Sequence, residues 1–490
     1  MADKQSFSCD KNYIIKLLLS LGIIAVFWFM PPVNPITKVG MRVLGTFIGT
    51  VLLLSTVDTI WPVFLSFILL SLTGVMSLNE VIQGSIGNWI TSFVIASFIL
   101  TNTLNESGFT SRLTNKILSL KISKSSPWAF TFVFYGICYL VGSFMDQVPA
   151  TAFFLAFASE ILDTVGYKKE DKYSNVLVMG AVFAVNLGGA ATPISHSLAI
   201  LGMGIYEQTM GTAINLLDYM IYAVPTTLVL LIIMCLLIKF AIRPDVSKIS
   251  KFDIDDFVKD ERPMDLREKS IVTIFFFTVI MWILPGILEV FLGSKNESIM
   301  LLKQYSITFW AFAAVVILSV VRVNNKPLIN LKEMMDKKLP WATIFFISIG
   351  VLLGSALSVK ETGINDFVVV KLSPILEKSP ELAIVFLFAL GTTMLTNISS
   401  NVSTITIMTG VALSIAAAVP SVNPMALAIT TTMAGSLAYV LPSSFATIAM
   451  LHSHENSDSK MVYLYGCIMV LFSGIVATFL GYNLFDYIVK

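Results

Sequence analysis

A pattern that occurs twice, in a chain made mostly of apolar runs, restricts the fold more than any other feature. Each copy has a Glu-Ser-Gly or Glu-Thr-Gly triplet, then a Lys-Ser-Pro type break, then an apolar stretch that a polar cluster interrupts. These landmarks lie at 106–108, 124–127 and 146–149 in the first half, and at 361–363, 378–380 and 399–401 in the second. Duplicated halves with apolar runs broken midway indicate a secondary transporter and point to its binding site.

Composition places the whole chain in a membrane. It is 56% hydrophobic and 13% charged, whereas a soluble domain carries about 25% charged residues. We therefore expect an integral protein of the bacterial cytoplasmic membrane, surrounded by lipid. The polar, basic start at 1–16 leads into an apolar run, as in a signal anchor, because Pro31-Pro32 and no small-residue cleavage site follows it. The net charge of +1 predicts no nucleic-acid partner.

The apolar runs predict an all-α polytopic protein, since backbone groups inside a bilayer must be paired within the protein. We expect about 11 spans of the ~20-residue kind, two of them broken, and two hairpins. The single spans are 13–30, 40–57, 60–76, 89–107, 218–242, 271–292, 305–322, 341–358 and 461–487, the broken spans are 175–206 and 425–451, and the hairpins pair 128–145 with 150–165 and 382–397 with 402–418.

Basic residues indicate how the two hairpins are oriented. Most of the 32 Lys and Arg residues fall on inner segments if the N-terminus is inside. Basic loops at 109–126 and 166–174 flank the first hairpin on both sides, so it enters and returns on the inner face. One flank of the second hairpin, 420–424, is uncharged, which favours entry from outside. The result is an inverted repeat with two re-entrant hairpins. The alternative is that each pair forms two ordinary spans joined by a tight turn.

Four breaks at membrane depth carry the functional prediction. Non-helical backbone survives there only where it is buried in protein or lines a wet cavity. Two breaks are the hairpin tips, 146–149 and 396–401, and two interrupt single spans, at 186–197 and 441–445. Each offers a helix N-terminus, which suits an anion, and freed carbonyls, which suit Na⁺. We predict an anion carrier coupled to a cation. Alternatively, Pro193 and Pro442 are simple kinks, and Asp146 and Ser400 are helix caps.

This layout resembles the divalent anion/sodium symporter family, which carries di- and tricarboxylates or sulfate. Four parts of the family's motifs are kept in whole or in part. The second tip reads Ser400-Asn401-Val402 against the family's Ser-Asn-Thr, Thr396 stands where the family has a sodium-contacting threonine, and Gly188-Gly189 and Leu441-Pro442 are present. The departures are Asp146-Gln147-Val148 at the first tip, Ser195-His196-Ser197 in place of Gly-Thr-Pro, and Ser444-Phe445-Ala446 in place of Ala-Thr-Pro.

The resemblance implies a homodimer that works as an elevator, with scaffold helices at 1–107 and 243–358 and a mobile transport part at 108–242 and 359–490. The breaks and the resemblance together predict two residue sets. Substrate-binding residues are Asp146, Gln147, Val148, Ser195, His196, Ser400, Asn401, Val402, Ser444 and Phe445, and Na⁺ ligands are Asp146, Gly188, Thr396, Ser399, Asn401 and Ser443. The coupling ion is Na⁺ or H⁺, and no organic cofactor is expected.

Asp146 is the sharpest departure, since a carboxylate at bilayer depth is costly and usually functional. It binds Na⁺ directly, or is protonated and couples transport to H⁺, or caps its helix or meets an amine on a zwitterionic substrate. His196 lies within a break and could donate to a carboxylate or titrate with Asp146; the alternative is an ordinary buried histidine. Phe445, Val148 and Val402 favour a mono- or dicarboxylate over citrate.

Other functions fit less well. An enzyme is not expected, because the sequence has no metal-ligand cluster, nucleophile motif or phosphate-binding loop. A channel needs a continuous polar stripe, whereas polar residues here gather at the breaks. The remaining alternatives are a proton-coupled anion or zwitterion carrier and a cation/proton antiporter. The antiporter predicts two or more acids near the crossing of the broken helices, and only Asp146 qualifies.

Overall fold

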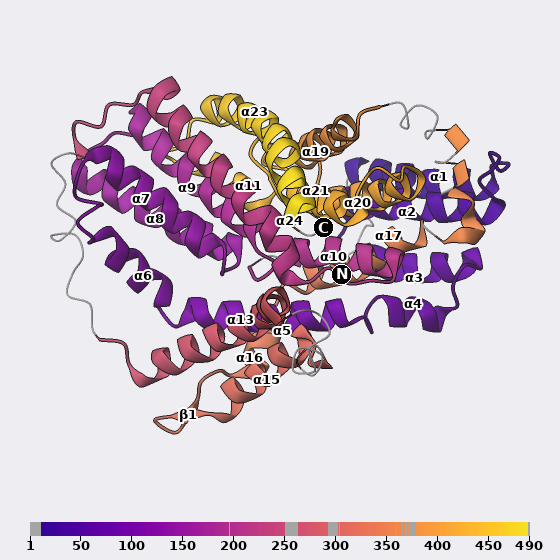
Figure 1. Cartoon of the computed structure of the whole chain (residues 1–490), viewed down its shortest axis with the longest axis horizontal. Helices are drawn as coiled ribbons and strands as arrows, with labels where there is room; N and C mark the ends of the chain where they lie inside the picture. Colours follow the sequence, from indigo (N-terminus) through magenta and orange to yellow (C-terminus); the bar gives the residue numbers. More distant parts are fainter. Residues whose placement is uncertain are drawn as a thin grey trace, which may run out of the picture.

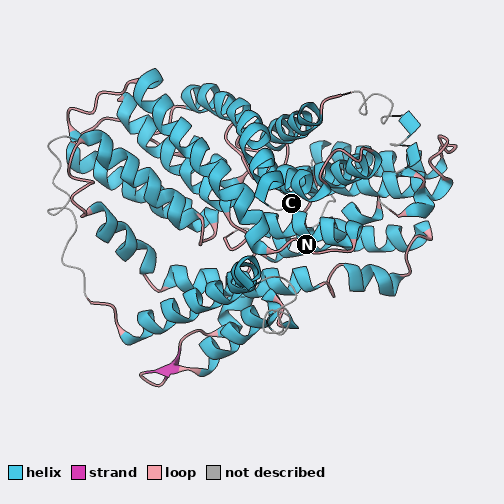
Figure 2. Ribbon diagram, in the orientation of Figure 1, coloured by secondary structure: helices cyan, strands magenta, loops and turns pink. Residues whose placement is uncertain are grey.

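The computed structural model describes residues 11–195, 197–249, 263–292, 302, 304–357, 359–364, 366–367, 370–371 and 379–488. Helices make up almost all of this part of the chain, as Figure 2 shows. The described residues contain one β-hairpin, formed by the two-residue strands β1 (Arg322–Val323) and β2 (Lys326–Pro327). The prediction of an all-α polytopic protein is confirmed.

Every predicted span is a helix in the structure. The single spans are α1 (Lys11–Phe29), α2 (Lys38–Thr56), α3 (Trp61–Thr73), α5 (Trp89–Glu106), α11 (Leu216–Leu236) continued by η1 (Leu237–Ile242), α13 (Leu266–Leu292), α15 (Ile307–Val320), α17 (Trp341–Ala356), and α23 (Ser459–Val476) continued by η4 (Ala477–Tyr482) and α24 (Asn483–Ile488). By length and composition, 10 helices of the described chain could cross a membrane, or up to 11 if a bent pair is one span.

The two hairpins and the two broken spans are also present. The first hairpin pairs α7 (Pro127–Gly142) with α8 (Gln147–Val165), and the second pairs α19 (Glu381–Ile398) with α20 (Asn401–Ala418). The broken spans are α9 (Lys172–Ala191) with α10 (Ser197–Met210), and α21 (Pro424–Gly435) with α22 (Ala446–Ser453). In Figure 1 the first hairpin lies toward the left end of the molecule and α20 toward the right.

The structure explains the landmarks that occur twice in the sequence. Gly108 (φ +86°) follows α5, and Gly363 (φ +66°) follows the short helix η3 (Lys360–Thr362). Both glycines adopt the left-handed conformation that ends helices and that other residues rarely adopt. Ser126 then caps α7 by accepting a hydrogen bond from the Ala129 backbone N–H, with Pro127 in the first turn. The glycine of each triplet is therefore a helix stop signal, and Ser126 with Pro127 is the start signal of the first hairpin.

Among the described residues, three short α-helices besides η3 were not predicted from the apolar runs. They are α4 (Leu78–Gly84), α6 (Phe109–Leu118) and α16 (Leu331–Lys337). A capping box between Ser77 and Glu80 starts α4. All three are too short to cross a membrane, so a search for runs of spanning length passes over them.

The apolar interior forms two clusters. The smaller one joins α2, α3 and α4 to α17 and the residues around η3. The larger one contains both hairpins, both broken spans, α5, α11, α13 and α15. Figure 1 shows α1 to α4 and α17 gathered on one side and α6 to α9 at the other end. α17 belongs to both apolar clusters, since it packs on α3 as well as on α10 and α20.

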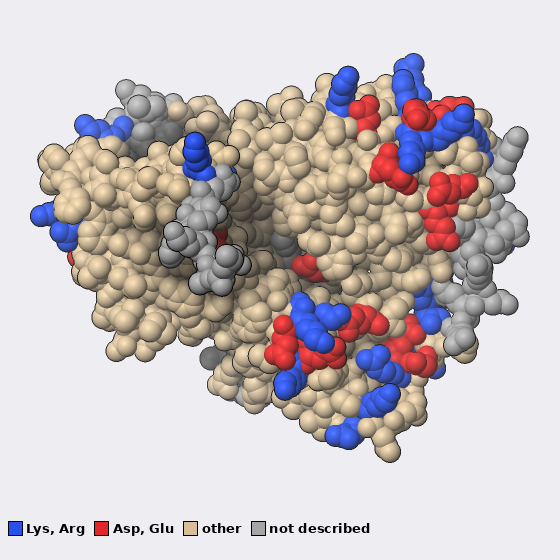
Figure 3. All heavy atoms as spheres, turned by 180° about the vertical axis from the view of Figure 1, so that it is seen from behind, with Lys and Arg blue, Asp and Glu red and all other residues tan. Residues whose placement is uncertain are grey.

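Charged side chains gather in separate clusters on the surface. Figure 3 shows these clusters with broad areas between them that carry no Lys, Arg, Asp or Glu. One partly buried ion pair joins α6 to α13: the Arg112 guanidinium donates to both Glu268 carboxylate oxygens, at 2.8 and 3.0 Å. This distribution fits a protein whose flanks face lipid.

Candidate functional site

The four breaks lie within a few residues of their predicted positions, but the bounds of each need correction. The hairpin tips are 143–146 and 399–400 rather than 146–149 and 396–401, because α8 already begins at Gln147 and α19 stays helical through Ile398. In the first broken span the predicted break at 186–197 starts too early, because α9 stays helical through Ala191. In the second, the predicted break at 441–445 starts too late, because α21 ends at Gly435 and α22 begins at Ala446. Residues 192–195 and 436–445 are the described non-helical segments, with His196 outside the described residues.

The first hairpin packs very close to α9 at Gly188 and Gly189. This close approach explains why glycine stands at these two helical positions. A Cβ at Gly188 would lie 2.0 Å from the Tyr139 carbonyl oxygen on α7. A Cβ at Gly189 would lie 1.7 Å from the Gln147 Nε2 atom at the start of α8. The Thr192 hydroxyl then donates to the Ser143 carbonyl at the tip. The first tip therefore rests on the end of α9 and on the first break.

The second hairpin holds the second break through the side chain of Asn397. Its Nδ2 atom donates to the Leu437 carbonyl at 2.9 Å, and its Oδ1 atom accepts from the backbone N–H groups of Tyr439 (2.6 Å) and Val440 (2.9 Å). Asn397 is buried. One amide thus replaces the hydrogen bonds that these backbone groups lose where the helix ends, which is required at membrane depth.

Asn401 and Thr396 meet beneath the same tip. The Thr396 Oγ1 atom lies 2.6 Å from the Gly435 carbonyl and 2.8 Å from Asn401 Oδ1, yet a hydroxyl has a single proton. Rotating the Asn401 amide by 180° lets Thr396 donate to Gly435 and accept from the amide N–H, which satisfies the Thr396 hydroxyl. The free end of the amide is then an oxygen, a ligand that suits Na⁺.

Asn186 on α9 connects the two halves of the site. Its backbone carbonyl accepts from Gln147 Nε2 at 3.2 Å. Its side-chain Nδ2 donates to the Ala438 carbonyl in the second break at 3.0 Å, and its Oδ1 accepts from the Thr447 hydroxyl on α22 at 2.9 Å. The breaks predicted separately therefore belong to one buried hydrogen-bonded network.

Several buried polar atoms near the tips have no partner within the described chain. On the first hairpin they are Gln147 Oε1 and Thr151 Oγ1, and on the second they are the Asn401 amide end, Thr404 Oγ1 and Thr392 Oγ1. An unpaired buried polar group costs about 1–3 kcal/mol, so such groups indicate a bound ion, ligand or water. Thr151, Thr392 and Thr404 were not predicted; the signal was a hydroxyl about one turn from a tip for Thr151 and Thr404, and about two turns for Thr392.

The structure places the predicted site residues as follows. Asp146 caps α8 by accepting from the Val148 N–H at 3.0 Å, which is one of the three roles considered for it. Gln147, Ser400, Asn401 and Thr396 lie at the tips, and Gly188 lies under the first tip. Ser195 is buried and donates to the Gly189 carbonyl at 3.4 Å, and Ser444 is buried and donates to the Leu441 carbonyl at 2.5 Å. Val402 and Phe445 are partly buried and pack against the core. Ser399 is half-buried, whereas Val148 and Ser443 are exposed.

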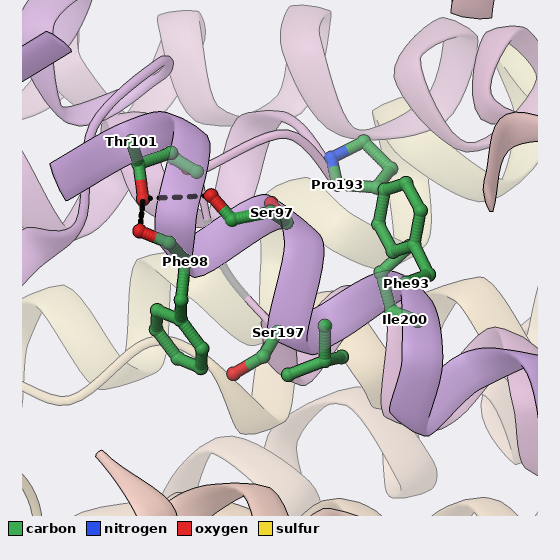
Figure 4. Close-up of a pocket in the computed structure, with 9 residues that line it drawn as sticks. Phe93, Ser97, Phe98, Thr101, Pro193, Ser197 and Ile200 are labelled. Carbon is green, nitrogen blue, oxygen red and sulfur yellow. Dashed lines mark hydrogen bonds between the residues drawn. The ribbon is translucent and has the colours of Figure 1, made fainter. Parts of the chain in front are cut away.

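A narrow cavity lies between α5 and the first break, shown in Figure 4. Ser97 and Thr101 line it from α5, and Pro193, Ser195 and Ser197 line it from the break and α10. Ser97 also donates to the Ile194 carbonyl at 3.3 Å. The cavity encloses about 10 Å³, room for about one water molecule. In this conformation, α5 and the first break are therefore in close contact.

Comparisons with known proteins agree on a transport protein. Residues 37–434 match the model of a family described as citrate transporter (CitMHS). The chain is 22% identical over 469 residues to the sodium-dependent dicarboxylate transporter SdcS of Staphylococcus saprophyticus, covering 90% of this chain and 85% of the relative. It is 23% identical over 500 residues to SdcS of Staphylococcus aureus strain USA300, covering 98% and 92%.

Two solved structures share the fold. One is the YdaH transporter of Alcanivorax borkumensis, with a TM-score of 0.54, 12% identity, and coverage of 96% of this chain and 98% of that one. The other is MtrF of Neisseria gonorrhoeae, with a TM-score of 0.50, 13% identity, and coverage of 96% and 93%. At this identity the likeness concerns architecture, and it agrees with the predicted transporter fold of paired hairpins and broken helices.

Proposed function

Because this chain belongs to the citrate transporter family, we propose that it carries a small mono- or dicarboxylate across the bacterial cytoplasmic membrane together with Na⁺. The curated relatives are named as sodium-dependent dicarboxylate transporters, which supports both the class of substrate and the ion. The predicted resemblance to the divalent anion/sodium symporters agrees with these relatives.

The observation that carries the proposal is the docking of each hairpin tip on a break. Asn397 and Thr396 hold the second break, and Gln147 and Thr192 join the first tip to the end of α9. Helix N-termini at such tips favour a carboxylate, and freed carbonyl and side-chain oxygens favour Na⁺. The four breaks contain no Lys or Arg, so helix dipoles and the coupled cation neutralise the substrate.

The proposed mechanism is an elevator in a homodimer. The small apolar cluster joins α2, α3 and α4 to one side of α17, and the larger cluster holds both hairpins, which supports a scaffold and a mobile part. α17 lies between them, because Ile344, Ile347 and Val351 belong to the larger cluster. α5, α13 and α15 belong to the larger cluster, although the predicted scaffold at 1–107 and 243–358 included them. We propose that α5 nevertheless stays with the scaffold, so that the hydrogen bond from Ser97 to the Ile194 carbonyl breaks and reforms as the transport part moves past α5.

The experiment that tests the function is uptake into proteoliposomes containing the purified protein. Succinate, malate, citrate, sulfate and an amino acid are offered in turn, each with a Na⁺ gradient, with a pH gradient, or with neither. We expect Na⁺-driven uptake of succinate or malate in excess of citrate. Uptake driven only by pH would replace Na⁺ by H⁺ as the coupling ion, and no uptake of any anion would favour the cation/proton antiporter.

Replacing Asp146 with asparagine is expected to alter the ion dependence of uptake more than the substrate affinity. Asparagine caps helices about as well as aspartate, so the hydrogen bond to the Val148 N–H survives while the charge is lost. The measurement is the apparent affinity for Na⁺ and the pH profile of uptake, together with the KM for succinate.

The matched control is Asp458→Asn, because Asp458 caps α23 in the same way, accepting from the Lys460 N–H at 2.9 Å, but outside the breaks. It should leave the Na⁺ and pH profiles of the parent unchanged. If Asp146→Asn does the same, Asp146 is only a helix cap.

A further inference from the structure

We infer that Asn186 is a positioning residue that couples the two halves of the transport site, so that occupation of one half changes the affinity of the other. The inference rests on the proposed Na⁺-coupled function and deepens it. Asn186 was part of a predicted break but was not among the predicted binding residues.

The second break is held from both halves of the chain at once. Asn397, from the second hairpin, donates a hydrogen bond to the Leu437 carbonyl and accepts hydrogen bonds from the N–H groups of Tyr439 and Val440. Asn186, from the first half of the chain, donates a hydrogen bond to the carbonyl of Ala438, which lies between Leu437 and Tyr439. Four successive residues of non-helical backbone are thus fixed by two asparagines, and removing either changes the conformation available to the segment.

A second contact on the same side of α9 supports this connection. Phe183 packs against Tyr439 with ring centroids 5.1 Å apart and an interplanar angle of 67°. Residues three apart on a helix share a face, so Phe183 and Asn186 present one surface to the second break. Thr447 on α22 also fixes the Asn186 side chain, because its hydroxyl donates a hydrogen bond to Asn186 Oδ1.

Gln147 connects the first tip to the same residue. One end of its amide, Nε2, donates to the Asn186 carbonyl, and the other end, Oε1, is buried without a partner in the described chain. A cation or a donor group that engages Oε1 fixes the Gln147 amide and with it the hydrogen bond to Asn186. With Asn186 fixed in position, its side-chain hydrogen bond also fixes the Ala438 carbonyl. Ala438 lies beside the residues to which Asn397 is hydrogen-bonded. Such a shared element provides a physical basis for coupling between sites.

The test measures coupling directly, as equilibrium binding of ²²Na⁺ to purified protein with and without saturating succinate. Coupling between sites usually changes affinity by about 5- to 150-fold, and we expect at least a fivefold rise in Na⁺ affinity in the parent. Thr447→Val removes only the hydroxyl that holds Asn186, and Asn186→Leu removes both side-chain hydrogen bonds. In both variants we expect the rise to fall to about twofold or less.

The matched control is Asn175→Leu, on the same helix. Asn175 is also buried and also donates to backbone carbonyls, those of Lys169 and Asp171, but it lies 11 residues before Asn186, about 16 Å along the helix axis. It should keep the coupling of the parent, which separates coupling from a general loss of packing.

Three outcomes contradict the inference. If Thr447→Val and Asn186→Leu keep the full rise in Na⁺ affinity, Asn186 does not couple the halves. If Asn175→Leu loses the rise equally, the effect is a general one of α9. If the parent itself binds no Na⁺, the proposed coupling ion is wrong and this inference falls with it, an outcome seen in the parent rather than in the variants.

Discussion

Replacing Asn401 with alanine is expected to abolish Na⁺-driven carboxylate uptake while leaving the protein folded. Asn401 begins α20, is buried, and has one end of its amide without a partner in the described chain. When Thr396 donates to the Gly435 carbonyl and accepts from the Asn401 amide N–H, that free end is a buried oxygen. Altering the surroundings of a metal site costs about 10- to 100-fold in affinity, and we expect at least about 100-fold in apparent Na⁺ affinity.

Folding should survive because the parent gains little stability from this side chain. Thr396 keeps its hydrogen bond to the Gly435 carbonyl when Asn401 is removed. The unpaired amide end costs about 1–3 kcal/mol in the absence of a ligand, so its removal offsets much of the lost packing. A variant at least as stable as the parent but inactive is the pattern of a residue kept for binding.

The measurements are Na⁺-driven succinate uptake in proteoliposomes and the melting temperature in detergent, with and without Na⁺. The matched control is Ser414→Ala, which removes a buried polar group from the same helix, where the hydroxyl donates to the Gly410 carbonyl at 3.2 Å. It should transport normally. Normal uptake by Asn401→Ala would remove Asn401 and its neighbours from the site.

The placement of the helices was predictable because a bilayer leaves an apolar run of spanning length few alternatives. The hairpins were predictable because their stop and start signals are local: Gly108 and Gly363 are left-handed, and Ser126 with Pro127 opens α7. Each of these signals acts on its own few residues. The short helices α4 and α16 depend on local caps too, but their polar surfaces resemble loops in a search for apolar runs.

The start of each break was not predictable from local sequence. Gly188 and Gly189 were interpreted as part of a break, yet they are helical, because glycine there permits close approach of α7 and Gln147. A glycine that serves packing and a glycine that serves a turn are the same letter in a sequence. Conversely, Ser436–Val440 has no breaker residue and is non-helical, because Asn397, some 40 residues earlier, satisfies its backbone.

The candidate site was predictable as a region but not as a network. The tips and breaks drew attention through polar residues within apolar runs, which is a signal of composition. The roles of Asn186 and Asn397 depend on hydrogen bonds that join positions up to 261 residues apart, which no spacing rule provides. Thr151 and Thr404 have the same character, since only their burial without partners distinguishes them from the hydroxyls that return a hydrogen bond to their own helix.

Replacing Gly188 with alanine is expected to disrupt the first half of the site and to reduce uptake by about 100-fold. The added Cβ would lie 2.0 Å from the Tyr139 carbonyl and 3.0 Å from the Ser143 backbone nitrogen. Both obstacles are backbone, so no side chain can rotate away, and the first hairpin must move from α9 by more than an ångström. A misplacement of about 1 Å costs on the order of 10²-fold where geometry is critical, and overpacking typically costs a further 1–3 kcal/mol of stability.

The matched control is Gly136→Ala on α7, where an added Cβ meets nothing within 4 Å. That change should be neutral or stabilise the helix by about 1 kcal/mol, the difference in helix propensity between glycine and alanine. Uptake and melting temperature of the two variants separate close approach from any general effect of losing a glycine in an apolar helix. If Gly188→Ala transports as Gly136→Ala does, the tip does not need its contact with α9, and a site built from hairpins docked on the broken helices loses its geometric basis.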